Sequence, residues 1–284
     1  MNLSLRKIGI ERWRLSAGTV ATVVMLVCLE SSQAQAPVPP ETTNWVASLS
    51  AGFTLTGGNT ETLQASLGFD AVRLWPRDEF RANLSVLYGE NDLHQKSGGQ
   101  NVSNVSTEKG IAMAQYNHLF TDRWYGSVRA DYLHDGISDV FYRFIIGPAA
   151  GYYVIKNDYT RFNLEVAPSL IYEKTREKDS IVSVGPPKVI HFEHPTHGYY
   201  LLRLTERLEQ KLSPSAKFWE QLDYLPPIDD FTGNYLLNGQ IGLEVAINTR
   251  LALRTVGYWN YDNQPSPHNE ANDLAWITSL VYKF

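Results

Sequence analysis

The chain ends in the stretch Asn272–Phe284, whose sequence is NDLAWITSLVYKF. Large apolar or aromatic residues fill five of the six alternate positions from Leu274 to Phe284. Alternation with a period of two is typical of a β-strand that has one apolar face. A strand of this length that closes the chain on an aromatic residue predicts the last strand of a transmembrane β-barrel. The pattern leaves one alternative open, the final strand of a soluble sheet.

Leu280, Tyr282 and Phe284 form the apolar face at the end of this strand. The pattern resembles the C-terminal signal that barrel-assembly machinery binds, in which a terminal Phe and the residues two and four before it face lipid. We therefore expect these three residues to direct assembly. The expected partners are this machinery and the lipid of the outer membrane.

The composition agrees with a protein that crosses a membrane with strands. The chain has 284 residues, 12% of them aromatic, including 16 Tyr and 7 Trp. Both residues combine an apolar body with a polar tip and are enriched where a membrane meets water. After residue 36 there is no run of 18 apolar residues, which excludes a spanning helix there. The net charge of −5 and the scattered positions of the basic residues do not indicate a basic surface that would bind nucleic acid.

Residues 1–36 have the features of a secretory signal peptide. A basic start precedes the apolar segment Leu15–Leu29, and Ala34-Gln35-Ala36 fits the cleavage rule for small residues. The basic residues are Arg6, Lys7, Arg12 and Arg14. A short membrane anchor is the alternative. Residues 37–44 are a proline-rich periplasmic spacer, so we expect the barrel domain to span residues 45–284.

Alternating strands begin directly after this spacer. In Trp45–Thr56, apolar residues occupy one face and small polar residues the other. Gly57-Gly58-Asn59 predicts a tight hairpin turn into a second strand, Thr60–Leu74, because Gly and Asn tolerate positive φ. Segments 160–173 and 235–247 alternate equally clearly.

Two neighbouring strands are harder to assign to faces. In segment 216–225, Glu220 falls on one face and Asp223 on the other. In the preceding strand, Glu206 shares a face with leucines. A carboxylate that points to lipid is unfavourable away from the interface. Either choice of the lipid-facing side of 216–225 would place a carboxylate there, and the apolar side of the preceding strand also carries one.

The connections between the expected strands alternate in length. The short ones are 75–78, 121–123, 156–158, 213–215 and 248–249. The longer ones are 91–106, 135–139, 174–197, 226–233 and 262–271. In bacterial barrels, short turns face the periplasm and long loops face the outside. The sequence therefore predicts an all-β fold: a single antiparallel transmembrane barrel of twelve strands with periplasmic termini. Ten or fourteen strands remain as alternatives.

Short motifs along the domain resemble a known family. They are the run AGFTLTGGNTET at 51–62, Tyr88-Gly89-Glu90, Arg123-Trp124-Tyr125 and the Tyr-x-Phe end. In this order they resemble the YdiY-like, salt-induced outer-membrane protein family, a family of barrels with a domain of unknown function. The resemblance covers residues 45–284 and departs at the long insertion near 174–197. It implies a barrel in a Gram-negative outer membrane and brings no catalytic residues.

Nine charged residues fall on the inward phase and are candidates to line the lumen. They are Arg81, Arg129, Asp131, Arg143, Arg161, Glu165, Arg203, Glu244 and Arg254. Such a set fits a selectivity lining in which bases favour anions. The alternative is a plugged lumen whose paired charges only support the wall. Inward small residues such as Ser127, Gly147 and Gly242 indicate room for water, and six arginines outnumber three acids. We therefore expect a narrow aqueous channel with mild anion preference.

Three histidines lie close together in the longest connection. His191, His194 and His197 fall within seven residues. Neutral imidazoles at such spacing can hold zinc or copper, which makes these residues candidates for a metal site. The alternative is a solvated loop, because no regular element fixes their spacing.

We expect no enzymatic activity and no cofactor. Outer-membrane phospholipase A is also a twelve-stranded barrel, but its His-Gly-Ser-Asn-Gly stretch is missing, since Tyr199 follows His197-Gly198. Neither a Gly-x-Ser-x-Gly elbow nor a phosphate loop is present. The expected function is a porin-like channel for unknown small solutes or ions, or a structural wall protein linked to salt or envelope stress. An outer-membrane hydrolase and an adhesion protein that acts through its external loops are the alternatives.

Overall fold

The computed structural model of the chain describes residues 45–56, 60–93, 102–137, 140–175, 196–265 and 271–284. The expected signal peptide 1–36 and spacer 37–44 lie outside these residues and stay predictions. Within the described part, no helix has the length and apolar composition needed to cross a membrane.

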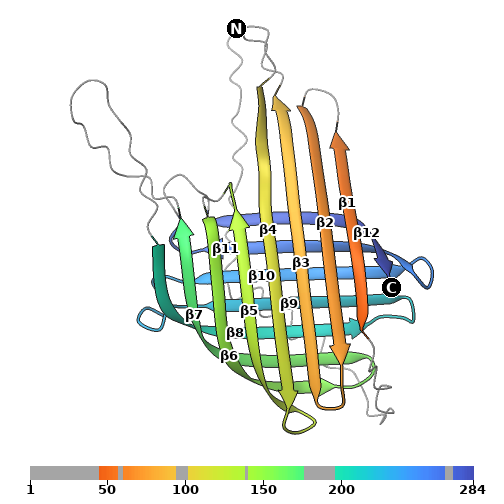
Figure 1. Cartoon of the computed structure of the whole chain (residues 1–284), viewed down its shortest axis with the longest axis vertical. Coiled ribbons are helices and arrows are strands. Elements are labelled where there is room, and N and C mark those ends of the chain that lie inside the picture. The colour runs from red at the N-terminus through yellow and green to blue at the C-terminus, as the bar shows by residue number, and fades with distance from the viewer. Residues whose placement is uncertain (1–44, 57–59, 94–101, 138–139, 176–195, 266–270) are drawn as a thin grey trace, which may run out of the picture. The chain divides into compact units, whose positions relative to one another are not determined.

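Twelve antiparallel strands make up the described part of the domain. They are β1 (Val46–Thr56), β2 (Thr60–Leu74), β3 (Asp78–Leu93), β4 (Val102–Leu119), β5 (Trp124–Asp135), β6 (Val140–Lys156), β7 (Thr160–Thr175), β8 (Thr196–Lys211), β9 (Ala216–Leu225), β10 (Leu236–Ala246), β11 (Leu251–Asp262) and β12 (Asn272–Lys283). Each strand pairs with its neighbours in sequence, and β12 pairs with β1, so the sheet closes into a barrel (Figure 1). The predicted twelve-stranded barrel is confirmed.

The outer face of the barrel is apolar, as the alternation predicted. On β12, Leu280, Tyr282 and Phe284 are 49%, 42% and 63% exposed, whereas Val281 faces inward and is fully buried. Exposed large apolar or aromatic side chains occur on eleven of the twelve strands within the described residues, and β9 is the exception. A closed wall with an apolar outside is the arrangement that lipid requires, because no backbone edge is left unpaired.

Small residues on the inner face make room for neighbouring groups. A Cβ atom added at Gly242 would collide with the ring of Trp219, which lies across it from β9. At Gly147 it would collide with the hydroxyl of Ser169 and the backbone oxygen of Pro168. The expectation that these two positions leave room for water is therefore wrong, because protein atoms occupy the space.

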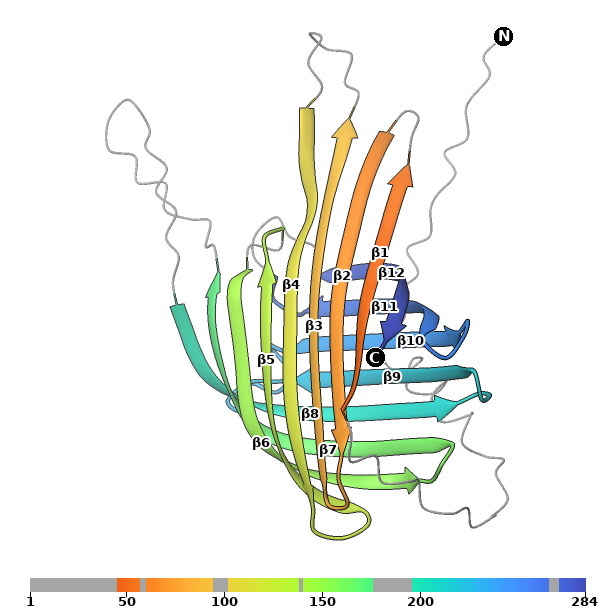
Figure 2. The same cartoon turned by 45° about the vertical axis from the view of Figure 1, so that its right-hand side comes forward.

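The two halves of the barrel wall run in different directions. In Figures 1 and 2, β1–β4 run steeply along one wall, and β8–β12 cross behind them. Long side chains from one wall reach the other: Arg81 of β3 meets Glu209 of β8, with Nη1 to Oε1 at 2.5 Å. The interior is therefore spanned by side chains as well as enclosed by the wall.

Glu206 and Glu220 stand on the outer face, on the adjoining strands β8 and β9. Their cross-strand neighbours are apolar: Leu164 and Leu222 for Glu206, and Leu208 and Ile241 for Glu220. Asp223 faces the interior and is 4% exposed. The structure thus resolves the ambiguity of 216–225 by placing Glu220 outside and the better-paired Asp223 inside.

Replacing both Glu206 and Glu220 with leucine is expected to stabilise the barrel in a bilayer, because a carboxylate facing hydrocarbon is unfavourable. The free energy of unfolding in phosphatidylcholine vesicles should rise by about 1 kcal/mol for each change. Urea titration followed by tryptophan fluorescence measures this. The exposed turn residue Asp122 is the control, since Asp122→Leu should leave the midpoint nearly unchanged. A drop in stability for the double variant would show that this face contacts something other than lipid.

The charged interior as a candidate functional site

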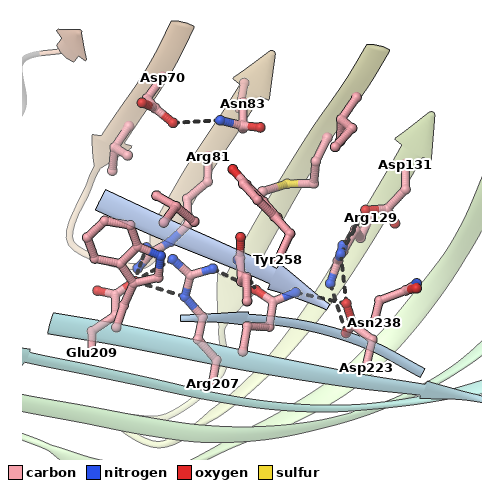
Figure 3. Close-up of a pocket in the computed structure, with 18 of the residues that line it drawn as sticks. Asp70, Arg81, Asn83, Arg129, Asp131, Arg207, Glu209, Asp223, Asn238 and Tyr258 are labelled. Atoms are coloured by element: carbon pink, nitrogen blue, oxygen red, sulfur yellow. Dashed lines mark hydrogen bonds and ion pairs between the residues drawn. The ribbon is translucent and has the colours of Figure 1, made fainter. Parts of the chain in front are cut away.

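A cavity of about 750 Å³ lies inside the barrel (Figure 3). All twelve strands contribute residues to its lining. Eleven lining side chains are basic: Arg81, Lys109, Arg129, Arg143, Arg161, Arg203, Arg207, Lys211, Lys217, Arg254 and Lys283. Six are acidic: Asp70, Asp131, Asp158, Glu209, Asp223 and Glu244. The cavity lining therefore contains more basic than acidic side chains.

The structure brings the nine candidates from the sequence together around this cavity. All of them except Glu165 line it. Glu165 is 4% exposed and lies in the wall, where its Oε1 accepts hydrogen bonds from Gln115 at 2.8 Å and Tyr125 at 2.6 Å. Eight of the nine candidates thus line the cavity, and their role in selectivity stays a proposal.

Sequence reasoning missed inward acids. Glu79, Glu173 and Glu209 also face the interior, as do Asp70 and Asp223. The sequence does indicate that Asp70 and Glu173 face inward, because each occupies an alternate position shared with the polar residues of its strand. Asp223 was hidden by the second carboxylate on β9. These acids reduce the expected excess of basic over acidic residues without removing it, because Glu79 and Glu173, which are not part of the cavity lining, contact Arg161 and Arg143.

Four of the charged residues form a central array: Arg129, Asp131, Arg203 and Asp223. Arg129 Nη2 lies 2.7 Å from Asp131 Oδ1 and 3.2 Å from Asp223 Oδ2. Figure 3 shows Arg129 between these two carboxylates. Arg203 Nη1 donates to the other oxygen of Asp131 at 2.6 Å. The array therefore links β5 to β8 and β9, and its two arginines share one carboxylate.

Two further ion pairs join strands that are not neighbours. Arg81 of β3 meets Glu209 of β8 at 2.5 Å, and Arg254 of β11 meets Asp70 of β2 at 2.5 Å. We call these two the cross-lumen pairs. Charges with little access to water have to be paired, because their desolvation is costly. The cross-lumen pairs therefore brace the wall and narrow the interior.

A tyrosine-rich network fills another part of the interior. Tyr153 donates to Glu79 at 2.7 Å, and Asn163 donates to the hydroxyl of Tyr125 at 2.7 Å. The rings of Tyr125 and Tyr153 pack with centroids 5.0 Å apart, and both residues are nearly fully buried. Side chains therefore fill this part of the interior.

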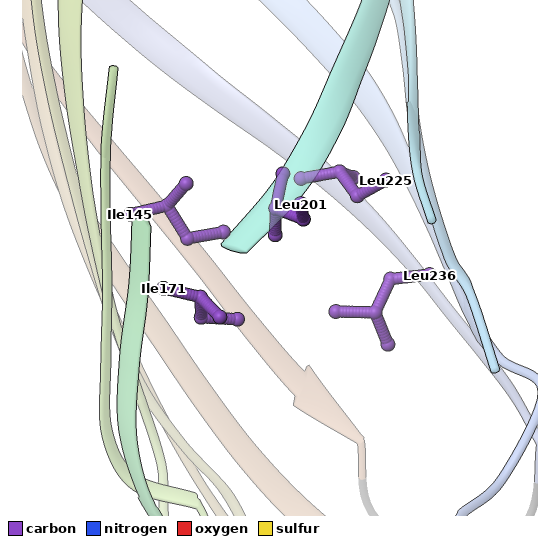
Figure 4. Close-up of a cluster of buried hydrophobic side chains, with 5 residues drawn as sticks. All are labelled: Ile145, Ile171, Leu201, Leu225 and Leu236. Carbon is purple, nitrogen blue, oxygen red and sulfur yellow. The ribbon is translucent and has the colours of Figure 1, made fainter. Parts of the chain in front are cut away.

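An apolar cluster lies on the inner face of five consecutive strands. Figure 4 shows its members, which are Ile145, Ile171, Leu201, Leu225 and Leu236. Ile145 lies opposite Asp131 in the ladder between β5 and β6, so the cluster adjoins the central array. Ile145 and Leu225 also line the cavity. The cavity thus has a charged part and an apolar part.

The predicted histidine cluster lies largely outside the described residues. His191 and His194 lie outside the described residues, and His197 lies on β8 opposite Glu173. Among the residues with a described placement, no group of three His, Cys, Asp or Glu side chains is arranged to hold a metal ion. The metal site at these histidines stays a prediction.

The sequence matches a known protein family over almost the whole domain. The family is described as "Protein of unknown function, DUF481", and it matches residues 49–284. The chain belongs to this family. The match confirms the family resemblance found in the sequence. No curated protein matches this chain.

Solved structures with a similar fold share little sequence with this DUF481 protein. The NanC porin is 9% identical, with a TM-score of 0.45, over 84% of this chain and 100% of that one. An outer membrane channel from Pseudomonas putida F1 is 9% identical, with a TM-score of 0.42, over 88% and 100%. The translocator domain of the autotransporter NalP from Neisseria meningitidis is 14% identical, with a TM-score of 0.40, over 84% and 88%. Likeness at this level carries no functional assignment.

Asp223→Ala is expected to destabilise the barrel by about 3 kcal/mol, because it leaves Arg129 buried without one of its two carboxylates. It also removes the acceptor for Thr205, whose hydroxyl lies 2.5 Å from Asp223 Oδ1. Asp223→Asn retains an acceptor and should cost less. Urea unfolding of the purified barrel measures both variants. Asp229→Ala, in an exposed connection, is the control; an equally small effect at both positions would contradict a bracing role for the central array.

Proposed function

We propose that the protein is an outer-membrane β-barrel that forms a narrow channel for small hydrophilic solutes and favours anions. One observation carries the proposal: a closed barrel with an apolar exterior encloses a cavity of about 750 Å³ in which basic side chains outnumber acidic ones, eleven to six. An apolar wall can contact lipid, while a polar lining replaces part of the hydration that a passing ion gives up.

The anion preference follows from the charge of the cavity lining. Lys211 and Lys217 lie opposite each other on β8 and β9, and both line the cavity near the turn 213–215. The side chain of Lys217 is 55% exposed, and Glu244 Oε1 lies 4.0 Å from its Nζ. Two adjacent cations with this much solvent access raise the local concentration of anions.

The proposed location is the outer membrane of a Gram-negative cell. The exposed apolar side chains on eleven strands support this location. In water, this large apolar surface would be unfavourably hydrated. The same proposal includes residues 1–36 as an export signal, both termini in the periplasm, and Leu280, Tyr282 and Phe284 as the signal for barrel-assembly machinery.

A structural wall protein is the second candidate function. The cross-lumen pairs favour it, because Arg81–Glu209 and Arg254–Asp70 join distant parts of the wall and restrict the lumen. Under this alternative the interior charges serve stability alone. A link to salt or envelope stress rests on the family resemblance and belongs to the same proposal.

Two other roles have less support. A hydrolase would need a nucleophile and base, and the sequence lacks the motif of outer-membrane phospholipase A. Adhesion through the connection 174–197 depends on residues of which 176–195 lie outside the described part.

Cysteine labelling of intact cells tests the location and topology. Asp229→Cys lies in the longer connection between β9 and β10, so a membrane-impermeant maleimide should label it from outside. Ser215→Cys lies in the short turn between β8 and β9 and should be labelled only after the outer membrane is permeabilised. Labelling of Ser215→Cys from outside would invert the topology, and recovery of the protein as a soluble periplasmic species would contradict the proposed location.

Planar-bilayer recording tests the channel. The purified barrel should conduct in steps and show a reversal potential displaced toward anions under a salt gradient. Lys211→Glu combined with Lys217→Glu should shift that potential toward cations by roughly 10 mV, because it reverses two charges at the cavity. Arg77→Glu, in an exposed turn outside the lining, should leave it unchanged. A sealed bilayer that contains folded barrel would contradict the channel and leave the structural wall.

A further inference from the structure

The eleven basic side chains of the cavity lining differ in how closely an acid neutralises them. Eight have a carboxylate oxygen within 3 Å, as Lys283 does with Glu244 at 2.7 Å. Three have no such partner among the described residues: Arg161, Lys211 and Lys217. We call these three the open bases.

The open bases lie together at one end of the barrel. They occupy β7, β8 and β9, which are consecutive in the ring. Arg161 follows the short turn 156–158, and Lys211 and Lys217 flank the short turn 213–215. Lys211 stands opposite Lys217 in the ladder, and Arg161 is the diagonal neighbour of Lys211. Side chains so related start about 5 Å and about 7 Å apart at Cβ, so all three cationic groups can reach one small ligand.

The nitrogens of the open bases are both unpaired and open to solvent. Arg161 makes no hydrogen bond with a described residue, and its one ion pair is long, with Nη1 3.8 Å from Glu79 Oε1. No nitrogen of Arg161 is both buried and unpartnered, so each of the three is accessible. Lys211 is exposed, and Lys217 is half-exposed with its Nζ 4.0 Å from Glu244. An anion that enters the cavity can therefore contact all three.

The acids at this end of the barrel are largely engaged elsewhere. Glu209 lies next to the open bases in the ladder, but its Oε1 is shared by Arg81 at 2.5 Å and Arg207 at 2.7 Å. Glu79 accepts a hydrogen bond from a buried tyrosine at 2.7 Å. Asp158 also lines the cavity, but it forms no ion pair with a described residue. The protein itself thus leaves the open bases without a close counter-charge.

The placement of Lys211 and Lys217 is unfavourable without a ligand. Like charges directly opposite each other in an antiparallel ladder repel and destabilise the sheet. Arg161 adds a third positive charge on the adjoining strand. A bound anion would remove this repulsion, and three cations on a curved wall suit an anion that accepts from several directions.

A phosphate group matches this arrangement better than a carboxylate. It carries about two negative charges at neutral pH, and its oxygens point in tetrahedral directions toward separate donors. A carboxylate has one charge and two oxygens in one plane, which suits a single guanidinium. Arginine and lysine both bind phosphate, the first as a planar fork and the second as a point charge.

We infer that the open bases form a binding site for a phosphate group, at the end of the cavity that bears the short turns. The inference rests on the proposed function in one respect, because it names the class of solute that the channel holds. That class is a small anion that carries a phosphate group, either inorganic phosphate or a phosphate ester.

Calorimetric titration of the folded barrel in a nonionic detergent tests this inference, with inorganic phosphate as the probe at constant ionic strength. Phosphate should bind saturably, and acetate about tenfold more weakly because it has one charge and two oxygens. Arg161→Gln and Lys211→Gln should each weaken phosphate binding about tenfold, because each removes a charged hydrogen bond to the ligand. Both side chains lack hydrogen bonds within the described residues, so both variants should fold, which unboiled gel mobility checks. Titration with glycerol 3-phosphate shows whether the ester or the free ion binds more tightly.

Lys109→Gln is the matched control. Lys109 lines the same cavity, but its Nζ already contacts Asp135 at 2.9 Å, ten positions from the short-turn end of β4. Phosphate affinity should change by less than about twofold in this variant, because distant charges are screened. No phosphate binding to the folded wild-type barrel, or equal affinity of the wild type and the two site variants, would overturn the inference. Acetate binding as tight as phosphate would also overturn it.

The binding and conductance experiments fail independently. Phosphate binding in a barrel that does not conduct would contradict the channel and retain the site at the open bases. Conductance with anion preference in a barrel that does not bind phosphate would retain the channel and remove the site.

Discussion

The hydrogen-bonded pairing of β12 with β1 is the constraint on which the rest of the barrel depends. Ser48 lies opposite Lys283 and Leu49 opposite Tyr282, so the first and last strands complete a ring. In a ring without edges, the backbone N–H and C=O groups find partners within the wall. Closure also fixes which side chains face out, because a slip of one residue would turn the apolar set of a strand inward.

Closure then sets the chemistry of the interior. Every second side chain faces a confined space, so charges from strands far apart in the sequence come within a few ångström of one another. An unpaired charge in such a space is costly, and the interior accordingly contains shared carboxylates such as Asp131 and cross-lumen pairs such as Arg81–Glu209. Large side chains also need space, which explains why Gly242 lies beneath the ring of Trp219.

In the proposed channel, bracing and solute passage depend on the same residues. The charges that hold the walls together also line the cavity of about 750 Å³, so stability and the proposed selectivity would be coupled. Arg203 Nη1 donates to Asp131, while Nε and Nη2 have no hydrogen-bond partner among the described residues. Basic residues nearer solvent, such as Lys217, contribute to the field with less effect on bracing.

The sequence by itself determined the strand number, the face that each clear strand turns outward, and the family. These features depend on local patterns: the period of two in Trp45–Thr56, the turn after it, and the alternating connection lengths. Local patterns failed at Glu220 and Asp223, where both faces carry a carboxylate. Only the tertiary structure decided the charge partners, since Arg254 and Asp70 stand 184 positions apart. Which side chains meet across the lumen depends on the stagger of all twelve strands around the ring, and no single segment encodes that stagger.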